Sequence, residues 1–221
     1  MSFGSIKATD RITTRSLSPQ DLYLEAFNRG LDTTLSLSDI CSLLQSQITD
    51  IEWQRQMLYW HSTLASEEQS IISSYTSYGY NHMNDSLRMF PDQEAEMNDV
   101  IEKAPPLPND IVVYRYISDV SHLPDEGLVV HNGYLSTTFL ASLVARASCE
   151  DDMKKLAVMR IVVPKGARCI YVPSYEYELI FSHKTKLMVL GKSSEEMVCS
   201  VVNNTKEEIT TVLVYQVEML K

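Results

Sequence analysis

The stretch Ala104-Pro105-Pro106-Leu107-Pro108 divides the chain into two parts with different sequence patterns. Proline lacks a backbone donor and disfavours helix in the residue before it, so a helix is not expected to continue through this stretch. Before the stretch, apolar residues recur at the spacing of amphipathic helices, and after it short β-rich segments predominate. Helices first and strands afterwards predict an α+β fold with a largely antiparallel sheet.

The N-terminal part predicts a series of helices. Ser18-Pro19-Gln20-Asp21 combines a hydroxyl cap, a proline at the first helical position and an acidic first turn, and Gly30 is expected to end that helix. Ser66-Glu67-Glu68-Gln69 has the pattern of a capping box, and Gly79 is expected to break the helix that follows. Other helices are predicted within residues 35–48, 51–60 and 83–90.

The C-terminal part predicts short strands and one helix. The helix is expected over residues 139–151, because Leu140, Leu143 and Val144 recur on one side. Pro164-Lys165-Gly166 indicates a turn between two strands. The predicted strands are residues 111–117, 133–138, 156–163, 169–172, 176–181, 186–190, 197–202 and 209–218.

Charge and hydropathy exclude several classes of function. The chain has 221 residues, of which 19 are basic and 29 acidic, so its formal net charge is −10. This charge argues against binding to nucleic acid or to an anionic membrane surface. No apolar run reaches the roughly 18 residues of a membrane span. The first residues lack the apolar stretch of a Sec signal peptide, so export by that route is not expected.

The cysteines and histidines give no sign of a metal site. Four cysteines and five histidines are scattered along the chain without the short spacings of metal ligands. We therefore expect no metal. The cysteines are interpreted as free thiols of a reducing compartment.

The clearest chemical feature is Glu176-Tyr177-Glu178. On a strand, residues two apart point to the same face, so the two carboxylates are expected to project together. Such a pair suits cleavage of a glycosidic bond, because one carboxylate stabilises a developing oxocarbenium ion and the other handles a proton. A solvated strand face with two ordinary glutamates is the alternative.

Three further features lie elsewhere in the sequence. Arg115 lies on one strand face with Val113 and Ile117. On this otherwise apolar face it needs an anionic partner, such as a phosphate or a buried acid. Ser136-Thr137-Thr138 presents hydroxyls that can orient a carboxylate on a neighbouring strand, although polar decoration of an edge strand is an alternative. Asn84 and Arg88 are one helical turn apart and could hold a phosphate, or simply lie on a helix surface.

These features belong to motifs that occur in one order: residues 75–88 with Asn84 and Arg88, Tyr114-Arg115, Gly133-Tyr134-Leu135-Ser136-Thr137-Thr138, Val163-Pro164-Lys165-Gly166 and Glu176-Tyr177-Glu178-Leu179-Ile180-Phe181. In this combination, the chain resembles the mono-ADP-ribosyltransferases of the Arg-Ser-Glu class, which are bacterial exoenzyme toxins and effectors. The resemblance covers about residues 66–219. It implies a mainly antiparallel β-sandwich core after the helical lobe.

The resemblance also implies a cleft for NAD⁺ as co-substrate. Arg88 and Arg115 would neutralise its pyrophosphate, Asn84 would bond to nearby groups, and Tyr75 would pack against the bound molecule. Ser136, Thr137, Thr138 and Glu178 would line the same cleft. Phe139 is the candidate for the aromatic ring that stacks on nicotinamide.

Catalytic roles follow from the same resemblance. Ser136 would fix the rotamer of Glu178, which would engage the nicotinamide ribose and stabilise the oxocarbenium ion. Glu176 would orient and deprotonate the acceptor. Tyr175 and Tyr171 would flank the turn that recognises the target protein.

We therefore expect transfer of ADP-ribose from NAD⁺ to a protein side chain, with release of nicotinamide. Arginine is the first expected acceptor, and threonine, asparagine or another residue is the alternative. NAD⁺ hydrolysis, an inactive NAD⁺- or protein-binding module and a glycoside hydrolase are the rival interpretations; the last ranks low because carboxylates two residues apart on one strand rarely straddle a scissile bond.

The expected organisation is an N-terminal helical extension over residues 1–65, without an assigned role, and a catalytic domain over residues 66–221. One continuous domain over residues 1–221 is the alternative. The expected partner is a target protein, in the first place a host protein, and the chain is expected to be a monomer. It is expected to reach the host cytoplasm without a Sec signal, or to act inside the producing cell.

Overall fold

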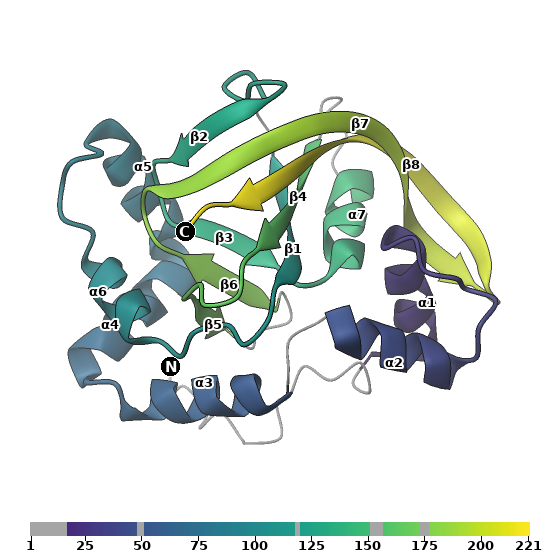
Figure 1. Ribbon diagram of the computed structural model, residues 1–221, viewed down its shortest axis with the longest axis horizontal. Helices are drawn as coiled ribbons and strands as arrows, with labels where there is room; N and C mark the ends of the chain where they lie inside the picture. The colour runs from purple at the N-terminus through teal and green to yellow at the C-terminus, as the bar shows by residue number, and fades with distance from the viewer. Residues whose placement is uncertain (1–16, 48–50, 118–119, 151–156, 173–176) are drawn as a thin grey trace.

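The computed structural model describes residues 17–47, 51–117, 120–150, 157–172 and 177–221. Helices occupy most of the first half of the chain (Figure 1). They are α1 (Pro19–Asn28), α2 (Leu37–Gln47), α3 (Ile51–Thr63), α4 (Ser66–Ser74), the π-helix η2 (Tyr75–Gly79), α5 (Tyr80–Met89), α6 (Glu96–Lys103) and, later in the chain, α7 (Ala141–Glu150). No helix among these described segments is long and apolar enough to span a bilayer.

The strands form one eight-stranded sheet in the order β2-β7-β8-β4-β1-β3-β6-β5. Every neighbouring pair is antiparallel except β4 and β8, which run parallel. The predicted α+β fold with a mainly antiparallel sheet is therefore confirmed. The strands are β1 (Ile111–Ile117), β2 (Gly127–His131), β3 (Leu135–Thr138), β4 (Ala157–Val163), β5 (Ile170–Val172), β6 (Glu178–Phe181), β7 (Thr185–Val202) and β8 (Thr205–Met219).

The main core packs the sheet, which consists of two parts, against the N-terminal helices. Strands β1 and β3 meet at the residue pair Tyr114 and Thr138, where the β2-β7-β8-β4-β1 part joins the β3-β6-β5 part. Both parts contribute to one buried cluster, for example through Val217 of β8 and Leu179 of β6. Helices α1, α2 and α3 contribute to the same cluster, with Leu22, Ala26, Ile40, Leu44, Trp53 and Met57.

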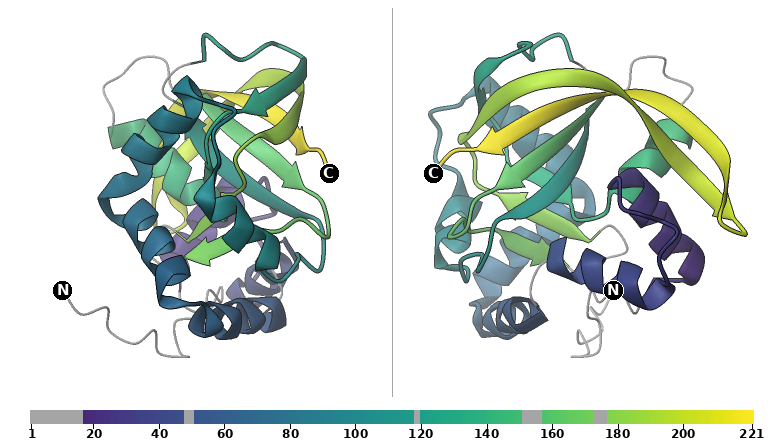
Figure 2. Two further views of the ribbon diagram at one scale, coloured as in Figure 1. Left: turned by 90° about the vertical axis from the view of Figure 1, so that its left-hand side faces the viewer. Right: turned by 45° about the vertical axis from the view of Figure 1, so that its right-hand side comes forward.

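Strands β7 and β8 form a long curved hairpin that arches over the sheet and reaches α1 (Figures 1 and 2). Leu24 of α1 packs against Val198 and Val201 of β7 in a small separate cluster. The side-chain amide of Asn28 donates to the Val198 carbonyl at 2.8 Å and accepts from the Val198 N–H at 2.7 Å. These bonds satisfy the Val198 backbone beside an irregularity in the β7–β8 register.

The predicted start and end of α1 are confirmed, whereas the predicted cap of α4 is shifted by one residue. Ser18 Oγ accepts from the Asp21 N–H at 3.1 Å, and Gly30 adopts a positive φ of 70° after the helix. At α4 the N-cap is Ala65, and the Glu68 carboxylate accepts from the Ala65 N–H at 2.9 Å. Glu68 therefore takes the third helical position, where its charge also suits the helix N-terminus.

The prediction that Gly79 breaks the helix is wrong. Helices α4 and α5 are joined by the π-helix η2, and Gly79 is its last residue. A π-turn bonds residues five apart, and a Cβ on Gly79 would lie 2.6 Å from the Ser74 carbonyl oxygen. The glycine thus permits the wide turn, and the chain continues as a helix into α5.

Three predictions in the C-terminal part are corrected. Strand β2 was not predicted, because a five-residue edge strand that begins with a glycine gives little periodic signal. The segments predicted at 186–190 and 197–202 belong to the single strand β7, which passes through Gly191 with a register shift. Cys199 is disulfide-bonded, so the expectation of four free thiols is wrong.

Replacement of Gly79 by alanine should lower the free energy of unfolding by about 1–3 kcal/mol, because the new methyl group collides with backbone rather than with a movable side chain. Urea denaturation measures this change. Ser70→Ala, at an exposed position of α4, is the control and should change stability by less than about 0.5 kcal/mol. An equally small effect at Gly79 would contradict the role of the π-turn.

Candidate active site

Strand pairing brings Ser136 and Glu178 together. In the β3–β6 ladder Thr138 lies opposite Glu178, and Ser136 lies opposite Ile180. Ser136 and Glu178 are therefore diagonal neighbours on one face of the sheet. The Ser136 hydroxyl donates to Oε1 of Glu178 at 2.5 Å, which fixes the orientation of a half-buried carboxylate.

Arg115 reaches the same place from β1. Its Nη1 donates to the backbone carbonyl of Ser136 at 2.5 Å. Arg115, Ser136 and Glu178, from three strands, are thus linked by two hydrogen bonds, one to the Ser136 carbonyl and one from its hydroxyl. The sequence prediction that Arg115, Ser136 and Glu178 converge is supported by this geometry.

Tyr75, Asn84 and Tyr134 form a buried wall beside these residues. Asn84 of α5 donates from Nδ2 to the Tyr75 hydroxyl at 3.2 Å and accepts at Oδ1 from the Tyr134 N–H at 2.8 Å. The Tyr75 and Tyr134 rings meet edge to face, with centroids 5.5 Å apart. A Cβ on Gly133 would lie 3.0 Å from Asn84 Oδ1, so the glycine allows this close approach.

Charges in this region influence one another. Burial is the main cause that lowers the pKa of Arg115, and the Arg88 charge adds to it, while Tyr75 and Glu178 act in the opposite direction. Burial likewise raises the pKa of the Tyr75 hydroxyl. His131, at the end of β2, has its pKa lowered to about 3 by burial and by Arg115 and Arg88, so its ring is neutral at pH 7.

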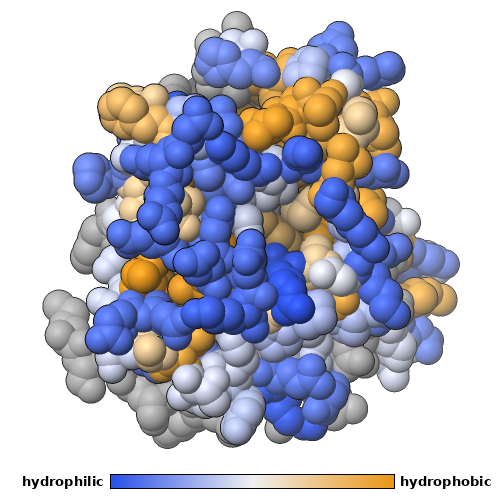
Figure 3. All heavy atoms as spheres, turned by 60° about the vertical axis from the view of Figure 1, so that its left-hand side comes forward, coloured by the Kyte–Doolittle hydropathy of each residue, from blue (hydrophilic) through white to orange (hydrophobic). Residues whose placement is uncertain are grey.

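Arg88 is the exposed member of this group. Its Nη1 lies 2.9 Å from Oδ1 of Asp85, and both side chains are about half exposed, at 48% and 63%. Hydrophilic residues cover most of the molecular face seen with α4, α5 and α6 forward (Figure 3). A screened surface pair of this kind is worth little energetically, so the Arg88 guanidinium can exchange Asp85 for another anion.

Four residues predicted to contact NAD⁺ are buried or form hydrogen bonds within the protein. Tyr75 is 1% exposed and Asn84 is 5% exposed, so both support the wall instead of facing solvent. Thr137 is buried and donates to the Leu179 carbonyl at 3.2 Å. Thr138 Oγ1 accepts from the Leu140 N–H at 3.1 Å, which shapes the turn before α7. The assignment of these four residues to NAD⁺ stays a prediction.

Two predicted aromatic roles are wrong. Tyr171 is 3% exposed and packs against Trp53 and Phe139, with ring centroids 6.2 and 6.0 Å away. It is therefore a core residue and offers no surface to a target protein. Phe139 is fully buried in the same cluster, so it does not present a ring for stacking on nicotinamide.

Glu176 and Tyr175 lie outside the described residues. Strand β6 begins at Glu178, and Tyr177 before it has a positive φ of 50°. Since a residue in the left-handed region is not extended, alternation along a strand cannot relate the two glutamates. The prediction that strand alternation places both carboxylates on one face is therefore wrong.

His131 and Tyr134 are site residues that the sequence analysis did not single out for a role. A lone histidine carries no spacing signal, and Tyr134 was noted only as part of a motif. Their importance comes from contacts between α5, α6 and the β2–β3 connection, such as the Met97 N–H bond to the Tyr134 hydroxyl at 3.0 Å. Among the residues that the structure describes, no cluster of three or more potential metal ligands occurs.

A mainly antiparallel sheet that joins an arginine, a serine and a glutamate from separate strands defines the class of the Arg-Ser-Glu ADP-ribosyltransferases. The profile of the ADP-ribosyltransferase exoenzyme family matches residues 51–216. The chain belongs to this family, and it is an NAD⁺-dependent ADP-ribosyltransferase of the toxin type that modifies a protein target.

Solved toxin structures share the fold. The chain is similar to Plx2a from Paenibacillus larvae, with 20% identity, a TM-score of 0.56 and coverage of 77% of this chain and 94% of that one. For C3larvin from the same organism the values are 17%, 0.54, 74% and 92%. For BECa of C. perfringens, solved with NADH, they are 19%, 0.53, 82% and 48%. The comparison with curated protein sequences gives no significant match.

Replacement of Asn84 by alanine should lower the free energy of unfolding by about 1–3 kcal/mol, because it leaves the buried Tyr134 N–H without its acceptor. Thermal or urea unfolding tests this expectation. Asn81→Ala, on the exposed side of the same helix, is the matched control and should be close to neutral. Equal stability of the two variants would contradict the role of Asn84 in the wall.

Proposed function

We propose that this chain transfers a single ADP-ribose from NAD⁺ to an arginine side chain of a host protein, with Arg88, Arg115, Ser136 and Glu178 as the residues that act on NAD⁺. The observation that carries the proposal is the pair of hydrogen bonds joining Arg115 to Ser136 and Ser136 to Glu178. It supports a site in which a fixed carboxylate lies near fixed positive charge.

The two arginines suit the pyrophosphate of NAD⁺. A guanidinium presents planar, paired donors that match phosphate oxygens. Arg115 is held by its bond to the Ser136 carbonyl, whereas Arg88 is about half exposed and forms a surface pair with Asp85. His131 is neutral at pH 7 and adds no positive charge beside these two arginines.

Glu178 suits the ribose end of NAD⁺. Transfer breaks the bond between the nicotinamide nitrogen and the ribose C1′; nicotinamide leaves with the bonding electrons, and C1′ becomes an oxocarbenium ion. A carboxylate oriented before the reaction stabilises this positive charge without reorganising. The Ser136 hydroxyl supplies that orientation at 2.5 Å.

The acceptor then forms a bond to C1′ and loses a proton. A protonated guanidinium is a poor nucleophile, so arginine as acceptor needs a nearby base. We assign this role to Glu176, two residues before Glu178 in the sequence. Tyr175 belongs to the same segment and is proposed to contact the target protein.

The remaining assignments follow from the kind of protein that the chain resembles. The family match and the toxin structures support action in a host cell on a host protein. We propose that the reaction needs no metal. We propose that the chain acts as a monomer, because the groups assigned to NAD⁺ come from one chain.

Glu178→Gln should reduce nicotinamide release by about a thousandfold, because the amide cannot supply the negative charge that the oxocarbenium ion needs. A fluorescence or chromatographic assay of NAD⁺ turnover measures this loss. Glu196→Gln, an exposed glutamate of β7, is the control and should keep full activity. Undiminished turnover in the Glu178 variant, with an unchanged Tm, would refute the assignment.

Arg88→Ala should weaken NAD⁺ binding by about tenfold, because it removes a charge-assisted contact to phosphate. Calorimetric titration measures the Kd. Arg55→Ala is a closely matched control, since Arg55 is also exposed and also pairs with an acid three residues before it, Glu52. If the two variants bind NAD⁺ equally well, Arg88 has no role in holding the pyrophosphate.

Glu176→Ala should lose transfer to protein while it retains NAD⁺ hydrolysis, because water needs less activation and positioning than a guanidinium. Labelled NAD⁺ and host-cell lysate report transfer, and mass spectrometry of the labelled peptide identifies the acceptor residue. Equal loss of both activities would contradict the division of labour between the two glutamates. Label on threonine or asparagine would replace arginine as the acceptor, and hydrolysis alone would indicate an NAD⁺ glycohydrolase.

A further inference from the structure

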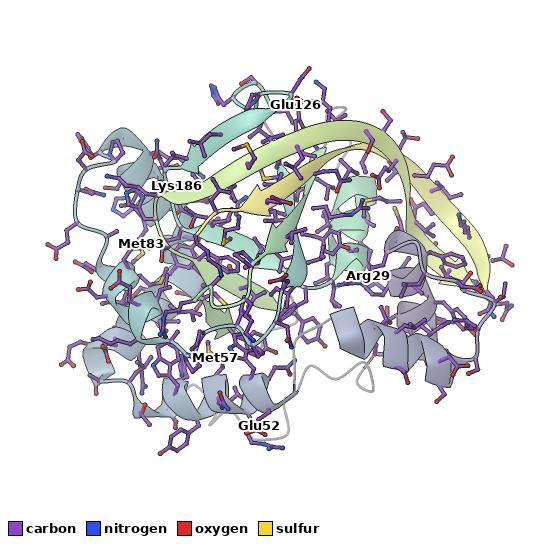
Figure 4. All side chains as sticks on the ribbon, in the orientation of Figure 1. Arg29, Glu52, Met57, Met83, Glu126 and Lys186 are labelled. Carbon is purple, nitrogen blue, oxygen red and sulfur yellow. The ribbon has the colours of Figure 1, made fainter. Side chains whose placement is uncertain are left out.

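A buried ion pair lies at the C-terminal end of α1, outside the span matched by the family profile. Arg29 Nε lies 2.5 Å from Glu25 Oε1, and the two side chains are 1% and 0% exposed. Figure 4 labels Arg29 between α1 and the sheet. Two charges removed from water in this way require several further partners to be tolerated.

Those partners belong to the segment that follows β3. The Glu25 carboxylate accepts from the Ala141 N–H at 3.0 Å and from the Ser142 N–H at 2.9 Å, at the N-terminus of α7. Arg29 Nη2 donates to the backbone carbonyl of Phe139. One ion pair therefore fixes both the carbonyl and the amide groups of the turn between β3 and α7.

The same pair also touches β1. The Arg29 guanidinium lies 5.3 Å from the centre of the Tyr114 ring, a cation–π distance. Tyr114 precedes Arg115 in the chain, and it forms the β1–β3 pair with Thr138. The contacts of Arg29 thus lie on either side of the junction that joins the two parts of the sheet.

We propose that Glu25 and Arg29 are positioning residues for ADP-ribosyl transfer, because they hold the junction between β1 and β3 that carries Arg115 and Ser136. This inference rests on the roles proposed above for Arg115, Ser136 and Glu178. It makes α1 part of the catalytic unit and favours one continuous domain over a separate N-terminal extension.

Stability alone is a weak reason for such a pair. Well-packed apolar side chains of similar volume often stabilise a core as much as a buried ion pair does. Apolar side chains could not, however, accept from two helix N–H groups and donate to a backbone carbonyl. The Glu25–Arg29 pair forms directional hydrogen bonds to this backbone, and these bonds define the position of the β3–α7 turn.

Two conservative variants of the full chain test the proposal. Arg29→Lys keeps a positive charge beside Glu25, but one ammonium group cannot reproduce the planar arrangement that serves both Glu25 and Phe139. Glu25→Gln keeps the shape of the side chain, but its amide nitrogen cannot accept from the Ala141 or Ser142 N–H.

Asn28→Ala is the matched control. Asn28 lies on the same helix, is buried and bonds twice to backbone, but its bonds go to Val198 of β7 rather than to the β3–α7 turn. It should lower Tm as the other two variants do. If α1 only stabilises the fold, all three variants should behave alike.

Nicotinamide release is measured at a temperature where every variant is fully folded. We expect kcat to fall about tenfold in Arg29→Lys and Glu25→Gln, with the KM for NAD⁺ within threefold of wild type, and kcat to stay within twofold in Asn28→Ala. Hydrogen exchange should become faster in β1 and β3 in the first two variants only. If one of the two fails to fold, the other decides by the same measurements.

Unchanged kcat and unchanged exchange in β1 and β3 in Arg29→Lys and Glu25→Gln, relative to Asn28→Ala, would overturn the proposal. A wild-type chain without nicotinamide release would instead overturn the proposed function. In that case hydrogen exchange still tests whether the ion pair holds the β1–β3 junction, so the two failures are distinguishable.

Discussion

A guanidinium that is largely withdrawn from water must be matched by oxygen acceptors, and the structure around β1 and β3 follows from this requirement. Arg115 satisfies it on the backbone carbonyl of Ser136, which places the Ser136 hydroxyl at 2.5 Å from Glu178. The desolvation that lowers the pKa of Arg115 also strengthens its attraction to anions, because interactions between charges grow as water is excluded. A residue suited to a phosphate is thus built into the sheet itself.

A second buried charged group lies on the opposite side of the β1–β3 junction, and it too is matched by bonding partners. Glu25 and Arg29 form an ion pair whose remaining bonding capacity is directed at the turn after β3. Only short stretches of strand and turn separate the two charged groups. Because the core is closely packed, a shift of the ion pair is expected to move the residues of the β1–β3 junction as well. The N-terminal helices share the main core with the sheet, and they belong to the packing that supports the site.

Much of the architecture was predictable because local signals and tertiary packing agree. The cap at Ser18, the positive φ at Gly30 and the span of β1 follow rules that need only neighbouring residues. The errors have local causes as well. Gly79 is a helix breaker by propensity, but a π-turn uses it to continue the helix. The Glu25–Arg29 pair was not predicted, because a spacing of four residues is also that of an ordinary surface pair.

The order of motifs in the sequence determined the class of chemistry, because residue types and their sequence separation are enough to specify an arginine, a hydroxyl and a carboxylate on three separate β segments. Only the tertiary structure decided which side chains face the site. Tyr171 and Thr137 carry polar groups that could serve a ligand, yet both are buried in this fold. Burial depends on which strands and helices pack over a residue, and that information is distributed over the whole chain rather than carried by any single motif.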